Sequence, residues 1–287
     1  MAQVTNSLVK TNQKPKFSVA IKSEGYQNLI NTTLRDPKRA NRFVANITSA
    51  VAVNPLLADC DAGTILSGGL LGESLNLSPS PQLGQFYLVP FNDKNRGKVA
   101  TFQLGYKGFV QLAIRSGYYT KLNVLPIKVG ELIKFDPLEE TIHVNLIEDD
   151  SVRENTPTSG YYAFFEYANG FKKAIYWSKE KMEAHALKYS QGYRADKKNG
   201  TEYTFWAKSF DDMAMKTMLR QLISKWGVMS TELQEAFIKD EAVIDEKGNV
   251  DYIDNPSGED TIVVETPNGE IIEEPKEELT RQQSLVF

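Results

Sequence analysis

Residues 84–117, "GQFYLVPFNDKNRGKVATFQLGYKGFVQLAIRSG", decide the fold because their periodicity changes along the segment. The runs 84–91 and 98–106 are rich in β-forming residues, and turn-forming residues separate them. This pattern is typical of a β-hairpin. From residue 107 the spacing becomes helical, with Phe109, Leu112 and Ala113 on one face. We therefore predict a hairpin that leads into a helix, which Gly117 ends with a left-handed cap.

The same segment has an unusual charge pattern. Residues 94–128 contain seven Lys and Arg residues and no Asp or Glu, whereas an ordinary surface mixes the two signs. Phosphates attract cations, and single-stranded bases stack on flat rings. The interleaved aromatic residues are assigned mainly to the core, with Phe102 and Phe109 at buried positions. The outward residues predicted to face a phosphate backbone are Arg96, Lys98, Lys107, Gln111 and Arg115.

A second basic, aromatic segment runs from Lys188 to Lys225. We predict one long helix over residues 202–226, preceded by a polar loop at 191–200. On that helix Lys208, Lys216 and Arg220 recur in one row, and Phe210 lies near its start. This row is a second candidate for phosphate contact.

The other elements mix helices and strands without strict alternation, which predicts the α+β class. Asp36 is expected to cap a helix that begins at Pro37, and Ser178 to cap another. Further helices are predicted at 17–34, 37–53, 62–75, 179–190 and 230–238, and strands at about 118–128, 131–135, 140–147, 160–168 and 171–177.

Charge divides the chain into a basic body and an acidic tail. Residues 239–287 hold 14 acidic and 4 basic residues, net −10, whereas residues 1–238 carry a net charge of +6. Such a division is common where a body binds a polyanion. We predict a disordered N-terminus at 1–16, a folded core at 17–238, and an acidic tail at 239–287 that is largely disordered, with a hairpin, or forms a small partner-binding region.

Several function classes lack support in the sequence. No apolar run is long enough to span a membrane, and no P-loop glycine motif is present. The lone Cys60 excludes an internal disulfide and fits a reducing cytoplasm. His143 and His185 lack neighbours at metal-ligand spacing. A metal-dependent nuclease with a basic cleft stays open as an alternative, because carboxylates cluster within 139–150 and at Asp211–Asp212.

Four blocks of the chain resemble the RecT family of phage and prophage single-strand annealing proteins. The second block, "FQLGYKGFVQLAIRSG", and the fourth, "FWAKSFDDMAMKTMLRQLISKW", carry the most specific motifs. The stretch "LNLSPS" departs slightly, because many relatives have Gly-Leu before the proline. The matching blocks lie at 65–91, 102–117, 159–190 and 205–226.

The resemblance implies a protein of the bacterial host cytoplasm that binds single-stranded DNA without sequence preference and anneals complementary strands without ATP. It implies a curved antiparallel hairpin sheet against a long helix, and assembly into rings or helical filaments with DNA in a shared basic groove. It also implies that the core at 17–238 is a DNA-binding and oligomerisation core. No catalytic residue, metal site or cofactor is expected, although Mg²⁺ is expected to influence annealing without a dedicated site.

The implied partners are single-stranded DNA, the annealed duplex, other copies of the chain, a 5′→3′ exonuclease and the host single-strand binding protein. Lys107 and Arg115 would hold phosphates, and Tyr106 or Phe210 would contact bases. The positions that match the family's motifs, and are therefore assigned to the groove, are Gln103, Tyr106, Lys107, Gln111, Arg115, Lys208, Lys216 and Arg220.

Overall fold

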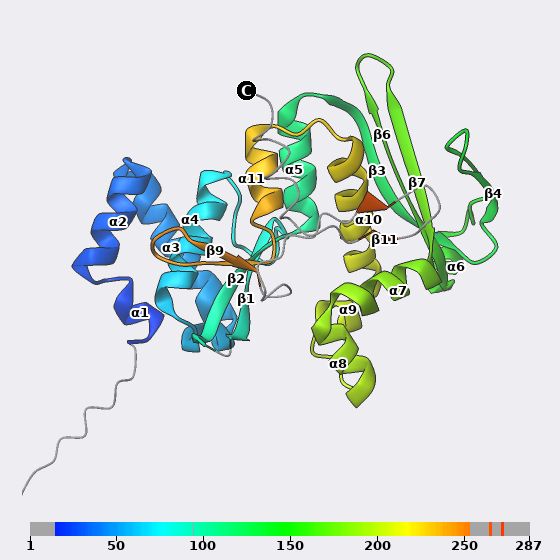
Figure 1. Ribbon diagram of the computed structural model, residues 1–287. Coiled ribbons are helices and arrows are strands. Elements are labelled where there is room, and N and C mark those ends of the chain that lie inside the picture. Colours follow the sequence, from blue (N-terminus) through cyan, green and yellow to red (C-terminus); the bar gives the residue numbers. More distant parts are fainter. Residues whose placement is uncertain (1–14, 94, 253–263, 266–270, 273–287) are drawn as a thin grey trace, which may run out of the picture.

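The predicted hairpin forms one edge of a four-stranded antiparallel sheet in the computed structural model, which describes residues 15–93, 95–252, 264–265 and 271–272 (Figure 1). Strand β1 (Phe86–Asp93) pairs with β2 (Gly97–Leu104), and Phe86 lies opposite Leu104. At the turn, the Asp93 carboxylate accepts hydrogen bonds from two backbone amides. The hairpin prediction is confirmed.

Two short strands from beyond residue 238 complete this sheet. Strand β8 (Ala242–Ile244) pairs with β2 and strand β9 (Val250–Tyr252) pairs with β8, so the order is β1-β2-β8-β9. Ala242 and Val243 are buried. The structured body therefore continues through residue 252, whereas the sequence placed the start of the tail at 239. Acidic composition did not indicate these two strands, which are stabilised by pairing of β8 with β2 and of β9 with β8.

The N-terminal helices, blue and cyan in Figure 1, lie beside this sheet, and α4 packs against its strands β1, β2 and β8. Helix α4 packs its small residues on the hairpin: a Cβ added at Gly72 would lie 2.3 Å from the ring of Phe86. Glycine at this position is what permits the close approach of the helix to the sheet. The helices are α1 (Phe17–Ala20), α2 (Glu24–Leu34), α3 (Pro37–Val53) and α4 (Ala62–Ser74), with a 3-10 turn at Pro55–Asp59.

The helix starts follow the capping rules. Asp36 accepts a hydrogen bond from the amide of Lys38 at the start of α3, and Asp61 accepts from two amides at the start of α4. The single helix predicted over 17–34 is wrong, because α1 and α2 are separate. Ile21 is buried between them, and its carbonyl accepts a hydrogen bond from the Gln27 side chain.

A second antiparallel sheet, of order β3-β6-β7, packs against the central helix α10 (Phe210–Trp226). Its inner face is apolar, with Val124, Tyr161, Ala163 and Phe165 buried. Figure 1 shows α5, α11 and α10 between the two sheets. The remaining elements of this half are β3 (Tyr119–Lys128), β6 (Thr158–Tyr167), β7 (Lys172–Ser178), α5 (Tyr106–Ser116) and α11 (Thr231–Ile238). The predicted α+β class, with a hairpin sheet and a central helix, is confirmed.

A hairpin of β4 (Leu132–Asp136) and β5 (Thr141–Val144) projects from this half and leads to α6 (Asp150–Asn155). Its base is held by Glu131, whose side chain has no exposed area and lies 2.6 Å from Nε of Arg153. Burial opposes ionisation, but the guanidinium and two backbone amides outweigh it and lower the pKa of Glu131. The carboxylate therefore stays charged and holds the base of the β4–β5 hairpin in place.

The region before α10 differs from the sequence prediction in two ways. Residues predicted as a loop form α8 (Gln191–Asn199), because Ser190 caps the helix and Tyr193 is buried. The long helix predicted over 202–226 is interrupted at Ser209, which separates α9 (Phe205–Lys208) from α10. Helix α7 (Lys179–Tyr189) begins at the Ser178 cap, as predicted.

The predicted disorder of residues 1–16 and of the tail concerns mainly residues outside the described part. In the tail, β10 (Val264–Glu265) and β11 (Ile271–Ile272) form a small antiparallel pair. Among the described residues, no helix has the length and apolar character needed to cross a membrane.

Candidate nucleic-acid interface

A cleft of about 370 Å³ lies where the two halves of the molecule meet. One wall comes from the turn before β1, and a second comes from the end of β2 and the start of α5. The third wall is α9 with the first turns of α10. The lining residues that matter most are Tyr87, Gln103, Tyr106, Lys107, Phe205, Asp212 and Lys216.

Glycines bring two of these walls into backbone contact. The amide of Gly105 donates a 2.8 Å hydrogen bond to the carbonyl of Gln85. A Cβ added at Gly108 would lie only 2.0 Å from that same carbonyl oxygen, and one at Gly105 would lie 2.2 Å from the carbonyl oxygen of Gly84. Any larger residue would force the walls apart. The "GQFY" and "GYKG" motifs therefore build one rigid corner that places Lys107 at the cleft.

Aromatic side chains form much of the cleft wall. The rings of Tyr87 and Phe205 lie 6.0 Å apart across it, and Tyr106 is half-buried against the core. Burial raises the pKa of the Tyr87 and Tyr106 phenols, so both hydroxyls stay neutral at physiological pH. Such groups present flat surfaces and hydrogen-bond donors, the combination that suits bases and phosphates.

The two lysines of the cleft have different surroundings. Lys107 is exposed, whereas Lys216 is only 7% exposed and lies 3.3 Å from the Asp240 carboxylate. Asp212, also on the cleft wall, is exposed. Lys107 is therefore positioned to meet a phosphate directly, while the charge of Lys216 is largely balanced within the protein.

Asp240 holds this corner together. Its side chain has no exposed area and accepts hydrogen bonds from the Leu104 amide at 2.7 Å and from Nη1 of Arg220 at 2.5 Å. The Arg220 guanidinium also lies 4.5 Å from the ring centroid of Phe237. Lys216 and Arg220 thus converge on one buried carboxylate, and Lys208, which is exposed on α9, does not share their row.

The other predicted site residues lie away from the cleft. Arg96 pairs with Asp251, and Lys98 lies 2.8 Å from Asp59, both near the hairpin turn. Gln111 is exposed on α5.

Two further predicted residues are engaged in packing. Arg115 is exposed overall but donates a 2.8 Å hydrogen bond to the carbonyl of Leu75. Phe210 packs in a cluster with Tyr161, Tyr193 and Trp206. Of the predicted residues, the structure therefore brings Gln103, Tyr106, Lys107 and Lys216 together at the cleft.

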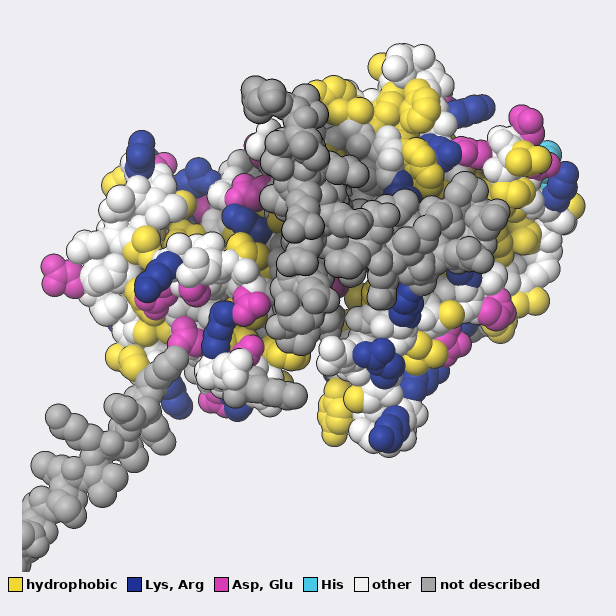
Figure 2. Space-filling view, viewed as in Figure 1, with side chains coloured by type: hydrophobic (Ala, Val, Ile, Leu, Met, Phe, Trp, Pro, Cys, Tyr) yellow, Lys and Arg dark blue, Asp and Glu magenta, His cyan; other side chains and the backbone are white. Residues whose placement is uncertain are grey.

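Sequence reasoning did not identify Tyr87 as a residue of the cleft, and it did not predict helix α8. Tyr87 stands in the "GQFY" motif, so the motif itself was the available signal. Figure 2 shows Lys and Arg side chains gathered over the lower right of the molecule, where α7, α8 and α9 lie. This surface includes the basic segment that begins at Lys188, of which residues 191–200 were expected in a loop.

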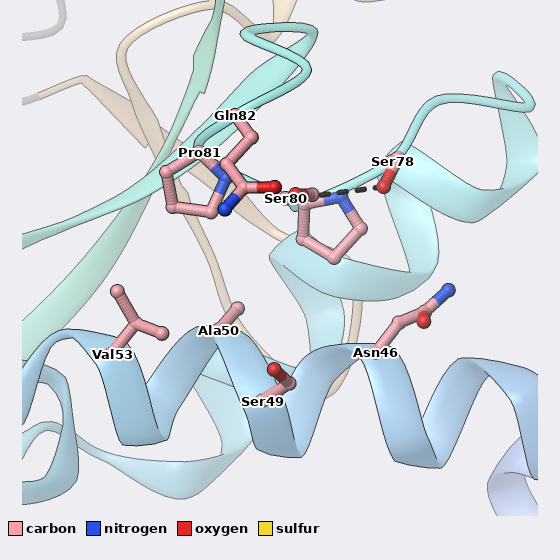
Figure 3. Close-up of a pocket in the computed structure, with 9 residues that line it drawn as sticks. Asn46, Ser49, Ala50, Val53, Ser78, Ser80, Pro81 and Gln82 are labelled. Carbon is pink, nitrogen blue, oxygen red and sulfur yellow. Dashed lines mark hydrogen bonds between the residues drawn. The ribbon is translucent and has the colours of Figure 1, made fainter.

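A second hollow, of about 280 Å³, lies between α3 and the proline-rich turn at 78–82 (Figure 3). Asn46, Ser49 and Ala50 face the turn, in which the amide of Ser80 donates a hydrogen bond to the Ser78 hydroxyl. No charged side chain lines this hollow, so it offers no cation to a phosphate backbone.

The carboxylates considered for metal chemistry have other contacts. Asp211 accepts hydrogen bonds from the hydroxyls of Tyr161 and Thr158, at 2.6 and 2.7 Å, and so ties α10 to β6. Among the described residues, no three or more His, Cys, Asp or Glu side chains are grouped as metal ligands.

The fold and the cleft define an α+β protein with an aromatic corner that carries one exposed lysine, a combination suited to nucleic acid. The RecT family profile matches residues 41–253, and the chain belongs to the RecT family. It is 33% identical to the uncharacterized protein YqaK of Bacillus subtilis over 96% of this chain and 93% of that relative. It is 28% identical to Protein RecT of Escherichia coli over 70% of this chain and 71% of that protein. Membership supports a role in DNA recombination by single-strand annealing.

Proposed function

We propose that the protein binds single-stranded DNA in the cleft at the start of α5 and anneals complementary strands without nucleotide hydrolysis. The observation that carries this proposal is the corner built by the family's own motifs, in which exposed Lys107 lines the same cleft as Tyr106 and Tyr87. A cation beside flat surfaces is the recognition chemistry of a single strand without sequence preference.

Annealing needs no covalent chemistry because it is energetically downhill. Base stacking and pairing contribute about 1.4 kcal/mol per step. The protein has only to lower phosphate repulsion and keep pairing edges accessible, so contacts through the backbone are sufficient. Mg²⁺ would act on the strands rather than at a protein site, and no catalytic residue is assigned.

The size of the cleft supports the assembly of several copies along one strand. A cavity of about 370 Å³ is in the range of small-ligand sites and accommodates only a short stretch of strand. A long strand therefore needs successive copies of the chain, arranged as a ring or helical filament whose clefts are continuous. The proposal places this assembly in the bacterial cytoplasm, with a 5′→3′ exonuclease and the host single-strand binding protein as partners.

The test is to mix labelled complementary strands with the purified protein in EDTA and, in a parallel reaction, in Mg²⁺. Accelerated pairing of intact strands is expected. Shortening of the strands that depends on a divalent metal would instead establish the nuclease alternative. Binding with no acceleration of pairing would reduce the protein to a strand-coating role.

A further inference from the structure

A strip of rings and lysines runs along one side of α7. On α7, Lys181, His185 and Tyr189 follow one another at intervals of four residues, which places them on one helical face. Trp177, near the end of β7, lies beside the start of this row. The His185 ring centroid lies 5.3 Å from that of Trp177 and 4.6 Å from that of Tyr189. The three rings therefore form a continuous row, in which neighbouring rings are tilted by 59° and 45°.

Lysine ammonium groups lie over both ends of this row. Nζ of Lys181 lies 4.6 Å from the Trp177 ring centroid, and Nζ of Lys188 lies 5.1 Å from the Tyr189 ring centroid. Both lysines are exposed. Each end of the strip thus combines one aromatic ring with one exposed ammonium group.

Lys181, Lys188 and Tyr189 are exposed and are not the residues that pack α7 onto the body, whereas Trp177 is half-buried against the core. Met182 and Ala186 are the residues of α7 buried in the core, and Glu183 faces α8, where it lies 2.8 Å from Lys197. Tyr189 is 45% exposed, so much of its ring is in contact with solvent. None of the five strip residues lines the cleft.

We propose that Trp177, Lys181, His185, Lys188 and Tyr189 form a second contact for single-stranded nucleic acid, separate from the cleft. This inference rests on the proposed function and extends it to another surface. Each lysine leaves its ring to bind a phosphate, and a base stacks on the ring face that it uncovers. The exchange is favourable because base stacking on a ring is stronger than an exposed cation–π contact.

The test measures binding of a fluorescent oligothymidine to the full chain, with substitutions that leave the core intact. Tyr189→Ala is expected to weaken binding about tenfold through loss of one stacked base, whereas Tyr189→Phe binds like the unaltered protein. Lys181→Ala and Lys188→Ala should each lower the slope of log affinity against log salt by about 0.7. Lys22→Ala, an exposed lysine on another part of the surface, is the matched control.

An abasic strand of equal length separates stacking from charge. On that strand the Tyr189→Ala penalty should disappear while the lysine effects remain. Penalties that are unchanged on the abasic strand would overturn the stacking role. Unaltered oligothymidine binding by Tyr189→Ala, Lys181→Ala and Lys188→Ala would overturn the site.

Failure of the strip and failure of the proposed function give different results. If the unaltered protein binds no oligothymidine, the proposed function fails. If it binds, and Lys107→Ala alone weakens binding, only the strip is rejected. The combined Lys107→Ala and Tyr189→Ala change should be additive in free energy, because the two surfaces are separate; strong non-additivity would contradict two independent contacts.

Discussion

Two rows of basic residues, similar in sequence, have opposite surroundings in the folded chain. On α5, Lys107, Gln111 and Arg115 are exposed along one face. On α10, Lys216 and Arg220 converge on the buried carboxylate of Asp240. Spacing alone predicts that charges share a helix face, but it does not predict whether that face meets solvent or another segment. The first row is available to a polyanion, and the second holds the sheet, α10 and the chain beyond α11 together.

The largest effect on the buried cluster around Asp240 is expected from truncation of the chain. Removing residues 240–287 deletes Asp240, β8 and β9, so we expect loss of cooperative folding. Removing residues 253–287 keeps all three, so this shorter deletion should fold. Circular dichroism and thermal unfolding of the two truncated chains measure the difference. Equal stability would show that residues 240–252 contribute nothing to the body.

A point substitution at Asp240 tests the buried ion cluster directly. Asp240→Ala leaves Lys216 buried without its main partner and removes the acceptor of the Leu104 amide. The expected loss of unfolding free energy is about 3–5 kcal/mol, measured by denaturant titration. Asp251→Ala, which breaks an exposed pair with Arg96, is the control and should cost about 0–1 kcal/mol. A small effect of both changes would contradict the structural role of Asp240.

The α5 row should affect binding rather than stability. Lys107→Ala is expected to weaken single-strand binding uniformly across sequences and to lower the salt slope by about 0.7. Arg115→Ala should have a smaller effect on the slope, because its guanidinium is already hydrogen-bonded to the carbonyl of Leu75. Fluorescence anisotropy at several salt concentrations gives both slopes, and Lys107→Arg should retain the contact. An unchanged slope in Lys107→Ala would remove this residue from the interface.

The smallest expected effect concerns the contribution of Asp196 to stability at low pH. The pKa of Asp196 is lowered chiefly by the Thr201 hydroxyl, with help from the amides and hydroxyl of the 203–204 segment, which outweigh burial. A lowered folded-state pKa means that stability is fully present above the unfolded value of about 3.9 and is lost as pH falls through the folded value. Unfolding measured between pH 6 and pH 2 should show this loss, and Asp196→Asn should flatten it. Identical acid profiles would contradict the assignment.

Local sequence rules predicted those parts of the fold whose stability is local. The hairpin, the caps at Asp36 and Ser178, and the turn at Gly117 were all predicted, because each depends on neighbouring residues. Helix α8 was missed because a polar composition concealed the buried side chains of Tyr193 and Asp196. The break at Ser209 was missed because residues 205–226 have helical spacing on both sides of it.

The candidate site was predictable in part. Gln103, Tyr106 and Lys107 lie in one motif, and the structure places them together with Lys216 at the cleft. Phe210 satisfied the same aromatic and positional criteria but packs among three other rings. His185 looked like an ordinary residue of a charged helix, and its position between Trp177 and Tyr189 became visible only in three dimensions.

By itself, the sequence determined the α+β class, the basic hairpin–helix segment and the family, because these depend on residue types and their local spacing. Only the tertiary structure decided which cations face outward. A lysine's exposure depends on the segments packed around it. Lys216 and Arg220 are paired with Asp240, which lies 24 and 20 residues away from them along the chain. Long-range pairing, which composition does not encode, separates a binding surface from an internal ion cluster.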